Sequence, residues 1–179
     1  MSEAGVTIAG SAIGATITVI GTLIIFFAQE KLRKRAKRKE VIQNAIDELI
    51  YNKAMVLSAR KSVEKAIEQL SVGQTNLYFT HSSKSIASIS IMAAYSDGIL
   101  LRILTPQLFA RLNQNVLVFF GDTSSPIETY ISTRINEFAQ GTYTPQDLYG
   151  TFTWIKDKAD EAIGDIDKTI RALRKKKVR

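Results

Sequence analysis

The chain has 179 residues, 45% of them hydrophobic and 23% charged, which is a composition able to bury a core and excludes general disorder. It has no cysteine and one histidine, His81, which excludes disulfide scaffolds, thiolate nucleophiles and multi-histidine metal sites. The net charge of +7 is unevenly placed, because residues 31–39 carry +7 and residues 171–179 carry +6, whereas residues 40–170 carry −4.

The first predicted element is a transmembrane helix, because the run from Ala4 to Gln29 has 26 residues without a charge. A helix of that length extends about 39 Å, which exceeds the roughly 30 Å hydrocarbon core of a bilayer. A secretory signal peptide has its cations before a shorter apolar stretch. A buried core helix seldom runs this far without a charge. We therefore expect a retained anchor at 1–29 with a short tail at 1–4.

The orientation is predicted from the cations that follow the apolar run, since Lys and Arg are retained on the cytoplasmic side. Seven cations come directly after it: Lys31, Arg33, Lys34, Arg35, Lys37, Arg38 and Lys39. We expect a single-pass protein of the cell membrane, with the N-terminus outside. The basic segment 30–39 and a helical bundle over 40–177 would then lie in the cytoplasm.

Small residues share one side of the predicted membrane helix and indicate a contact between helices. Gly10 and Gly14 form a G-x-x-x-G pair, and Thr18 and Gly21 continue the strip. Small residues let helix backbones approach closely in lipid, and hydroxyls can bond across helices. The alternatives are homo-oligomerisation, a partner's membrane helix, no specific role, or a pore lined by Thr7, Ser11, Thr18 and Thr22.

The two basic clusters are interpreted as contacts to anionic lipid headgroups, because each cation near such a surface adds attraction. The second cluster is the C-terminal tail 171–179, with Arg174, Lys175, Lys176 and Lys177 at its centre. Neither cluster has interleaved aromatic residues, and one adjoins a membrane span, so we do not expect nucleic acid as the partner.

The rest of the chain predicts an all-α fold, an antiparallel bundle of about four helices at 30–72, 82–104, 105–140 with a break near 121–125, and 145–177. Apolar residues recur every seven positions from Ile42 to Leu70, and Gly73 marks the end of that helix. The apolar stripe of the last helix runs from Leu148 to Leu173. Asp97-Gly98 is a candidate break within the second helix, and a short strand at 86–91 is the alternative to that helix. With an even number of helices, the C-terminal tail returns to the first basic cluster, whereas separate helices at 105–120 and 126–140 send it the other way.

Three hydroxyl–proline pairs predict helix starts, at Thr105-Pro106, Ser125-Pro126 and Thr144-Pro145. A hydroxyl residue caps the first amide groups, and proline fits the first helical position. Asp147, three residues after Thr144, resembles the second member of a capping box. Gly121 and Gly141 are expected to end the helices before them.

No catalytic, cofactor or metal site is predicted, since the sequence has no P-loop, no G-x-G-x-x-G and no G-x-S-x-G. His81 is interpreted as a surface or capping residue. The acidic residues of the last helix are interpreted as a solvated face: Asp157, Asp160, Glu161, Asp165 and Asp167. The aromatic residues near the start of this helix are interpreted as core, or as an exposed docking patch: Tyr143, Tyr149, Phe152 and Trp154.

We expect a non-enzymatic interaction or scaffold protein, or an accessory subunit of a membrane complex, with a self-assembling pore or membrane-perturbing effector as the alternative.

Overall fold

The structure is a computed structural model that describes the chain except for residues 1–2, 75–76, 78–85, 119, 121–125 and 178–179. Side chains are also outside the description at 3–21, 117–118, 126–128 and 177. The chain divides into two compact units, Met1–Glu40 and Val41–Arg179, and each is described here by itself. The described residues are helical or irregular and contain no strand, which confirms the all-α class.

Helix α1 (Glu3–Ser71) runs without interruption through both units. The absence of Gly and Pro between Thr22 and Val72 favours such continuity. Gly73 ends the helix in the left-handed region at φ +75°, a conformation that glycine adopts without strain. Its N–H donates to the Leu70 carbonyl, and the N–H of Gln74 donates to the Gln69 carbonyl, which is a Schellman motif.

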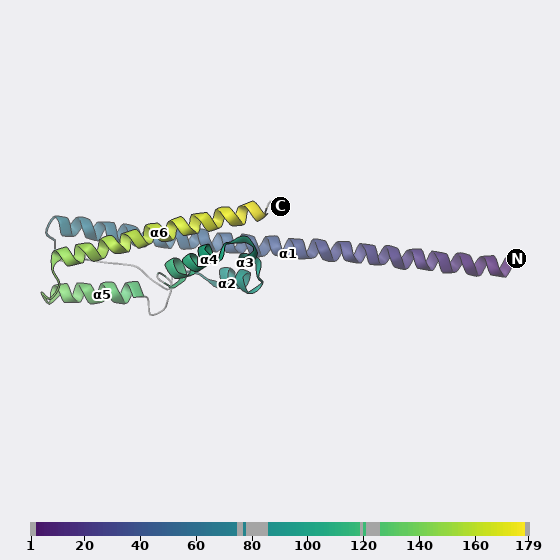
Figure 1. The fold of residues 1–179 in the computed structure, drawn as a ribbon, viewed down its shortest axis with the longest axis horizontal. Coiled ribbons are helices and arrows are strands. Elements are labelled where there is room, and N and C mark those ends of the chain that lie inside the picture. Colours follow the sequence, from purple (N-terminus) through teal and green to yellow (C-terminus); the bar gives the residue numbers. More distant parts are fainter. Residues whose placement is uncertain (1–2, 75–76, 78–85, 119, 121–125, 178–179) are drawn as a thin grey trace. The chain divides into compact units, whose positions relative to one another are not determined.

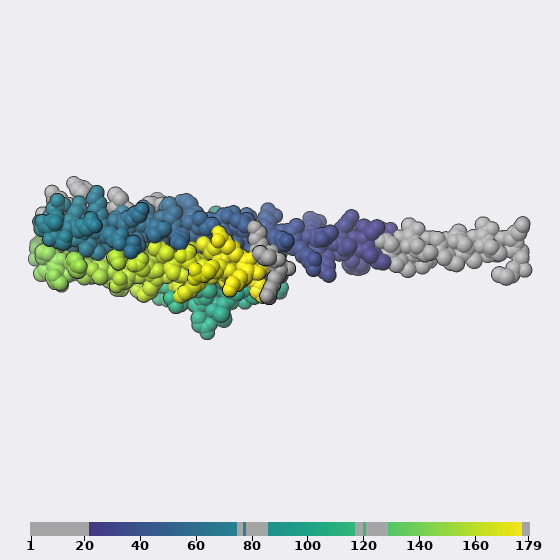
Figure 2. Space-filling model, turned by 90° about the horizontal axis from the view of Figure 1, so that it is seen from above, coloured from purple at the N-terminus to yellow at the C-terminus, as the bar shows by residue number. Residues whose placement is uncertain are grey.

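Helix α6 (Pro145–Lys177) has the predicted bounds and lies antiparallel to the Val41–Ser71 half of α1 (Figure 1). Two ion pairs fix the register. Lys53 binds Asp167 at 2.8 Å, and seven residues further along α1, Arg60 binds Asp160 at 2.6 Å. Ile46, Lys53, Arg60 and Ile67 form a second row of α1 at seven-residue spacing. Lys53 and Arg60 interrupt the apolar character of this row because they bind α6. Figure 2 shows the two helices packed side by side along this unit.

The third long layer consists of two helical segments, α4 (Pro106–Leu112) with the π-helix η2 (Asn113–Val118) and then α5 (Pro126–Ala139), which run one after the other and antiparallel to α6 (Figure 1). Helix α4 continues into η2, and α5 follows. The pieces form one interrupted layer, so the tail of α6 returns to the Val41 end of this unit. The helix end predicted at Gly121 and the N-terminal cap predicted at Ser125 lie outside the described residues. Gly141 ends α5 at φ +72° as predicted.

The prediction of a second long helix at 82–104 is wrong in its extent. Residues 78–85 lie outside the description, and residues 86–88 are irregular. Only α2 (Ile89–Ser96) and α3 (Ile99–Ile103) follow, separated at Asp97-Gly98 where a break was expected. Gly98 takes φ +67° at the junction. The described part of the bundle therefore consists of three long layers and a pair of short helices, instead of four long helices.

The core lies between these layers and follows the predicted apolar stripes. Ile42, Leu49, Val56 and Val63 of α1 are buried. The α6 stripe is buried throughout, at Leu148, Phe152, Ile155, Ala159, Ala162, Ile166, Thr169 and Leu173. Val116 and Phe120 bring the third layer into the same cluster. Burial of this surface is the main stabilising contribution to the bundle.

Two of the three hydroxyl–proline caps are confirmed. The Thr105 hydroxyl accepts from the Leu108 N–H at 3.2 Å, so Pro106 is the first residue of α4. The Thr144 hydroxyl accepts from the Asp147 N–H, and the Asp147 carboxylate accepts from the Thr144 N–H at 3.1 Å, which completes a capping box. Local hydrogen bonds therefore fix the start of α6, and the sequence predicts the residues that form them.

This capping box makes the stability of α6 dependent on pH. Hydrogen bonds from the Thr144 hydroxyl and backbone N–H lower the pKa of Asp147 below its ordinary value. A carboxyl whose pKa is lowered by folding stabilises the fold above its unfolded pKa of about 3.9, and this contribution is lost as the pH falls through the folded pKa. We expect Asp147→Asn to lower the unfolding midpoint at about pH 6 and to have little effect at about pH 2. Thermal melts of both proteins across this range, followed by circular dichroism, would measure it. An equal difference at every pH would contradict the assignment.

Candidate functional site

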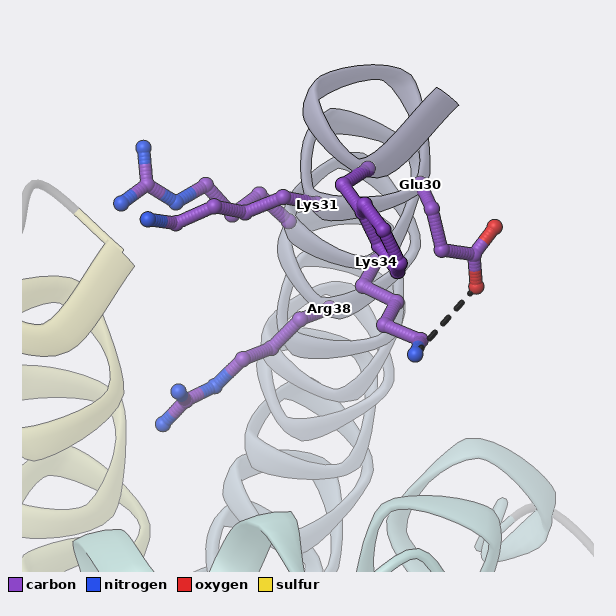
Figure 3. A pocket seen from close by; sticks show the side chains of 6 residues that line it. Glu30, Lys31, Lys34 and Arg38 are labelled. Carbon is purple, nitrogen blue, oxygen red and sulfur yellow. Dashed lines mark ion pairs between the residues drawn. The ribbon is translucent and has the colours of Figure 1, made fainter. Parts of the chain in front are cut away.

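The first predicted site, the cationic segment of α1, is exposed along its length. Every residue from Lys31 to Glu40 is exposed. Lys34 forms an ion pair with Glu30 at 3.3 Å, one turn earlier on the helix. Phe27, Glu30, Lys31, Lys34, Arg35 and Arg38 line an open hollow of about 410 Å³ along this side of α1 (Figure 3). The arrangement gives a concentrated positive charge without a competing acid beyond Glu30 in segment 30–39.

An apolar and exposed stretch ends at Phe27, four residues before Lys31. Leu23, Ile24, Ile25, Phe26 and Phe27 have exposed fractions of 49–66%. Five consecutive residues cover more than one turn of a helix, so this apolar surface extends around the whole circumference of α1. Within the described side chains, no helix has a stretch long and apolar enough to cross a membrane.

The predicted membrane-helix contacts lie on α1, but their side chains are outside the described residues. This applies to Gly10, Gly14, Thr18 and Gly21, and to the proposed pore-lining hydroxyls Thr7, Ser11 and Thr18. Most of the predicted membrane span from Ala4 to Gln29 falls in the same region. The helix–helix contact and the pore therefore stay predictions.

The second basic cluster is at the end of α6, in the other unit. Arg171, Arg174, Lys175 and Lys176 are exposed, and Lys177 is the last residue of α6, with its side chain outside the description. The register of the two ion pairs between α1 and α6 places Arg174 level with Ile46. Because Lys31–Lys39 belongs to the first unit, the predicted convergence of the two clusters on one surface stays a prediction.

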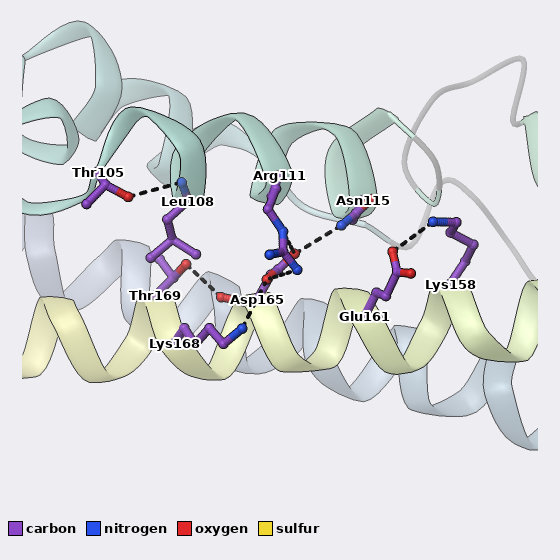
Figure 4. A network of polar contacts seen from close by, with 9 residues as sticks. All are labelled: Thr105, Leu108, Arg111, Asn115, Lys158, Glu161, Asp165, Lys168 and Thr169. Carbon is purple, nitrogen blue, oxygen red and sulfur yellow. Dashed lines mark hydrogen bonds and ion pairs between the residues drawn. The ribbon is translucent and has the colours of Figure 1, made fainter.

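One residue of the expected solvated acidic face is instead buried, which corrects that interpretation. The Asp165 side chain is 1% exposed. Its Oδ2 accepts from Arg111 Nε at 3.2 Å and from Asn115 Nδ2 at 3.0 Å, and Arg111 Nη2 lies 3.0 Å from Oδ1 (Figure 4). Lys168 Nζ is 3.9 Å from Oδ1. The cause is the third layer, since α4 and η2 cover a side of α6 that the main stripe leaves open.

The π-helix η2 belongs to the same polar cluster. Asn115 lies in η2, and Arg111 lies in the last turn of α4 directly before it. A π-turn adds a residue to the helical turn, and such turns are frequent at functional sites. Here the turn presents an amide to the buried carboxylate. The cluster joins two layers, and its polar groups are directed at one another, so we assign it a structural role.

A second set of polar contacts holds the short helices onto α1, and sequence patterns gave no indication of it. Asn52 is buried, its Nδ2 donates to the Ala87 carbonyl at 2.6 Å, and its Oδ1 accepts from the Ala87 N–H at 2.8 Å. The Glu48 carboxylate accepts from the N–H groups of Ser90 and Ile91 at 2.6 and 3.3 Å. A carboxylate at this position compensates the unpaired amides of the α2 N-terminus.

Replacing Asn52 should therefore destabilise the bundle. Asn52→Ala leaves both backbone groups of Ala87 without their partner in a half-buried position, and we expect a loss of about 2 kcal/mol in the free energy of unfolding. Urea unfolding of the full chain in mild detergent, followed by the fluorescence of Trp154, measures the bundle, because Trp154 is the single tryptophan. The exposed Asn44→Ala is the matched control and should change it by less than about 0.5 kcal/mol. Equal effects of the two variants would contradict the inferred clamp.

The aromatic residues at the start of α6 have different environments. Phe152 is buried in the core, which is one of the two predicted alternatives. The Tyr143 hydroxyl forms a hydrogen bond with the Thr151 hydroxyl at 2.9 Å. Trp154 packs edge-on against Tyr130 of α5, and Tyr149 is exposed beside a hollow between the end of α1 and the start of α6. Arg134 lies over the rings of Tyr130 and Tyr143, and its hydrogen bonds to Glu137 and Tyr130 raise its pKa.

The described residues do not assemble a metal site. No group of three or more His, Asp or Glu side chains there is placed to hold a metal ion. His81 lies outside the described residues. Comparisons of the chain with protein-family models, with curated proteins and with solved structures found no match.

Proposed function

We propose that this chain is a membrane-anchored interaction protein, in which the beginning of α1 crosses the bilayer and the helical bundle operates at the cytoplasmic surface without catalysing a reaction. One observation carries the proposal. Leu23–Phe27 exposes large apolar side chains around the full circumference of α1, and a segment of seven cations begins four residues later, at Lys31. A helix that is apolar all round requires an apolar environment on every side.

A lipid environment accounts for both parts of this segment. Apolar side chains exposed to water are unfavourable by about 25 cal/mol per Å² of surface, and the hydrocarbon core removes that cost. The charge-free sequence from Ala4 to Gln29 extends this surface to a length that spans the core. The cations of segment 31–39 would then lie at the cytoplasmic headgroups, where the positive-inside rule places them.

The bundle offers a surface for a protein partner on its short helices. Ile89 and Met92 lie one turn apart on α2 with exposed fractions of 84% and 43%, and Leu101 is exposed on α3. The opposite side of α2 buries Ile91 and Ala94. Glu48 binds the first amides of α2, and Asn52 binds the backbone of Ala87, two residues before the helix. Exposed apolar side chains on a rigidly held element are typical of interaction sites.

Membrane insertion and orientation are tested with single cysteines, because the chain has no native cysteine. Ser2→Cys and Lys176→Cys variants of the full chain are labelled in intact cells with a membrane-impermeant maleimide. We expect the protein to stay in the membrane after an alkaline carbonate wash. Ser2→Cys should react in intact cells, and Lys176→Cys only after permeabilisation. Release by carbonate would overturn the anchor, and reaction of Lys176→Cys in intact cells would overturn the orientation.

A further inference from the structure

Three of the seven cations in segment 31–39 share one narrow face of α1. Lys31, Arg35 and Arg38 are separated by four and three residues, and at about 100° per residue their directions fall within an arc of about 60°. Figure 3 shows Lys31 and Arg38 extending to the same side of the helix, whereas Glu30 and Lys34 extend to the other side. Arg33, Lys37 and Lys39 point outside this arc by the same geometry.

The charge of this face is not compensated within the described part of the chain. Lys34 is paired with Glu30, but no ion pair there involves Lys31, Arg35 or Arg38. The hollow of about 410 Å³ beside them is lined by these three cations, by Phe27 and by the Glu30–Lys34 ion pair, so its lining carries a net positive charge. Guanidinium groups suit phosphate oxygens, because their planar fork forms two parallel charge-assisted hydrogen bonds.

An exposed aromatic side chain adjoins the cationic face. Phe27 lies one turn before Lys31, lines the same hollow and is 66% exposed. The face thus changes from apolar to cationic within one turn, as the surface of a lipid changes from acyl chain to headgroup. A soluble anion would use the cations alone, whereas a lipid contacts both parts.

We propose that Phe27, Lys31, Arg35 and Arg38 form a binding site for the phosphate headgroup of an anionic membrane lipid, and that Arg33, Lys37 and Lys39 contribute charge without forming this site. The inference rests on the proposed membrane anchor. If Gln29 ends the span, the backbone of Lys31 lies about 3 Å beyond it, within the headgroup region, which is about 5–7 Å thick on each side of the core. The backbone of Arg35 lies about 9 Å beyond Gln29, and its long side chain reaches back into that region. Arg38 is about 10 Å beyond Lys31 along the axis, and its long side chain reaches back toward the phosphates.

The test compares two variants of the full chain with the same loss of charge. One is Lys31→Gln/Arg35→Gln/Arg38→Gln, and the other is Arg33→Gln/Lys37→Gln/Lys39→Gln, with Glu30 and Lys34 kept in both. Each is reconstituted in phosphatidylcholine vesicles. Spin-labelled phosphatidylglycerol or phosphatidylcholine then reports the fraction of lipid immobilised by the protein. Carbonate resistance is measured on the same samples.

We expect the native chain to immobilise phosphatidylglycerol in preference to phosphatidylcholine. In the first variant, the ratio of the two immobilised fractions should fall by about threefold or more. The second variant should keep most of it. An equal loss in both variants, with insertion intact, would show that only total charge matters and would overturn the site alone. Preference unchanged in both variants would overturn it as well. Release of the native chain by carbonate would overturn the anchor, and this site with it.

Discussion

Reversing the charge of the segment after the apolar run is expected to abolish the uniform orientation of the protein. Replacing Arg33, Lys34, Arg35, Lys37 and Arg38 by glutamate changes the net charge of residues 31–39 from +7 to −3. Cations close to a membrane helix determine which end stays in the cytoplasm, and acids do not substitute for them. The N-terminal tail has no Lys or Arg to take over this role.

The measurement is the labelling of Ser2→Cys and Lys176→Cys in intact and permeabilised cells. We expect the fraction of inserted chains with an external N-terminus to fall from nearly all to about half or less. The control reverses five cations of the bundle, Lys61, Lys65, Arg102, Lys156 and Lys158, which all lie more than 30 residues beyond Gln29. The control should insert normally. An unchanged orientation in the first variant would show that the cations of α1 do not set the topology.

The parts of the fold that local chemistry specifies were predictable from the sequence. The bounds of α6 follow from a proline-containing capping box and from an apolar stripe that continues to Leu173. The break at Gly98 and the stops at Gly73 and Gly141 follow from the left-handed conformation that glycine allows. In each case the determining contacts lie within about one turn, so the residue order alone contains the information.

The parts that depend on distant contacts were not predictable. Residues 86–104 have enough apolar side chains for a full leg, but Asn52 and Glu48, more than 30 residues earlier, hold the irregular backbone and fix the start of α2. Asp165 reads as solvated because it lies off the main stripe, yet α6 is covered by α1 on one side and by α4 and η2 on another. A helix with two neighbours buries a wider face than one stripe.

The proposed lipid site shows the same distinction. The sequence identifies seven cations and predicts a membrane surface as their partner. Helical geometry divides them into faces, and the Glu30–Lys34 ion pair and the hollow beside Phe27 indicate which face is uncompensated. The exposed apolar side chains of Leu23–Phe27 support the proposal that this segment lies at a boundary between hydrocarbon and water.

The buried carboxylate of Asp165 leads to the second large expected effect, a double mutant that is more stable than one of its parents. Arg111→Ala removes the two guanidinium contacts and leaves a charge at a side chain that is 1% exposed. Loss of the partner of a fully buried charge costs about 3–5 kcal/mol, and because the Arg111 side chain is itself 53% exposed we expect about 2 kcal/mol. Arg111→Ala combined with Asp165→Asn removes the orphan charge and can keep the contact to Asn115. The combination should recover about half of the loss.

Urea unfolding of the full chain, followed by Trp154 fluorescence, measures these differences within the bundle. The matched control is Arg60→Ala, because Arg60 makes the same kind of interhelical ion pair with Asp160, whose side chain is 45% exposed. That pair should contribute less than about 1 kcal/mol, since water can solvate the remaining carboxylate. Equal losses for Arg111→Ala and Arg60→Ala would mean that the burial of Asp165 has no energetic consequence. A double mutant less stable than Arg111→Ala would mean that the carboxylate is stabilised by Asn115 and Lys168 without the guanidinium.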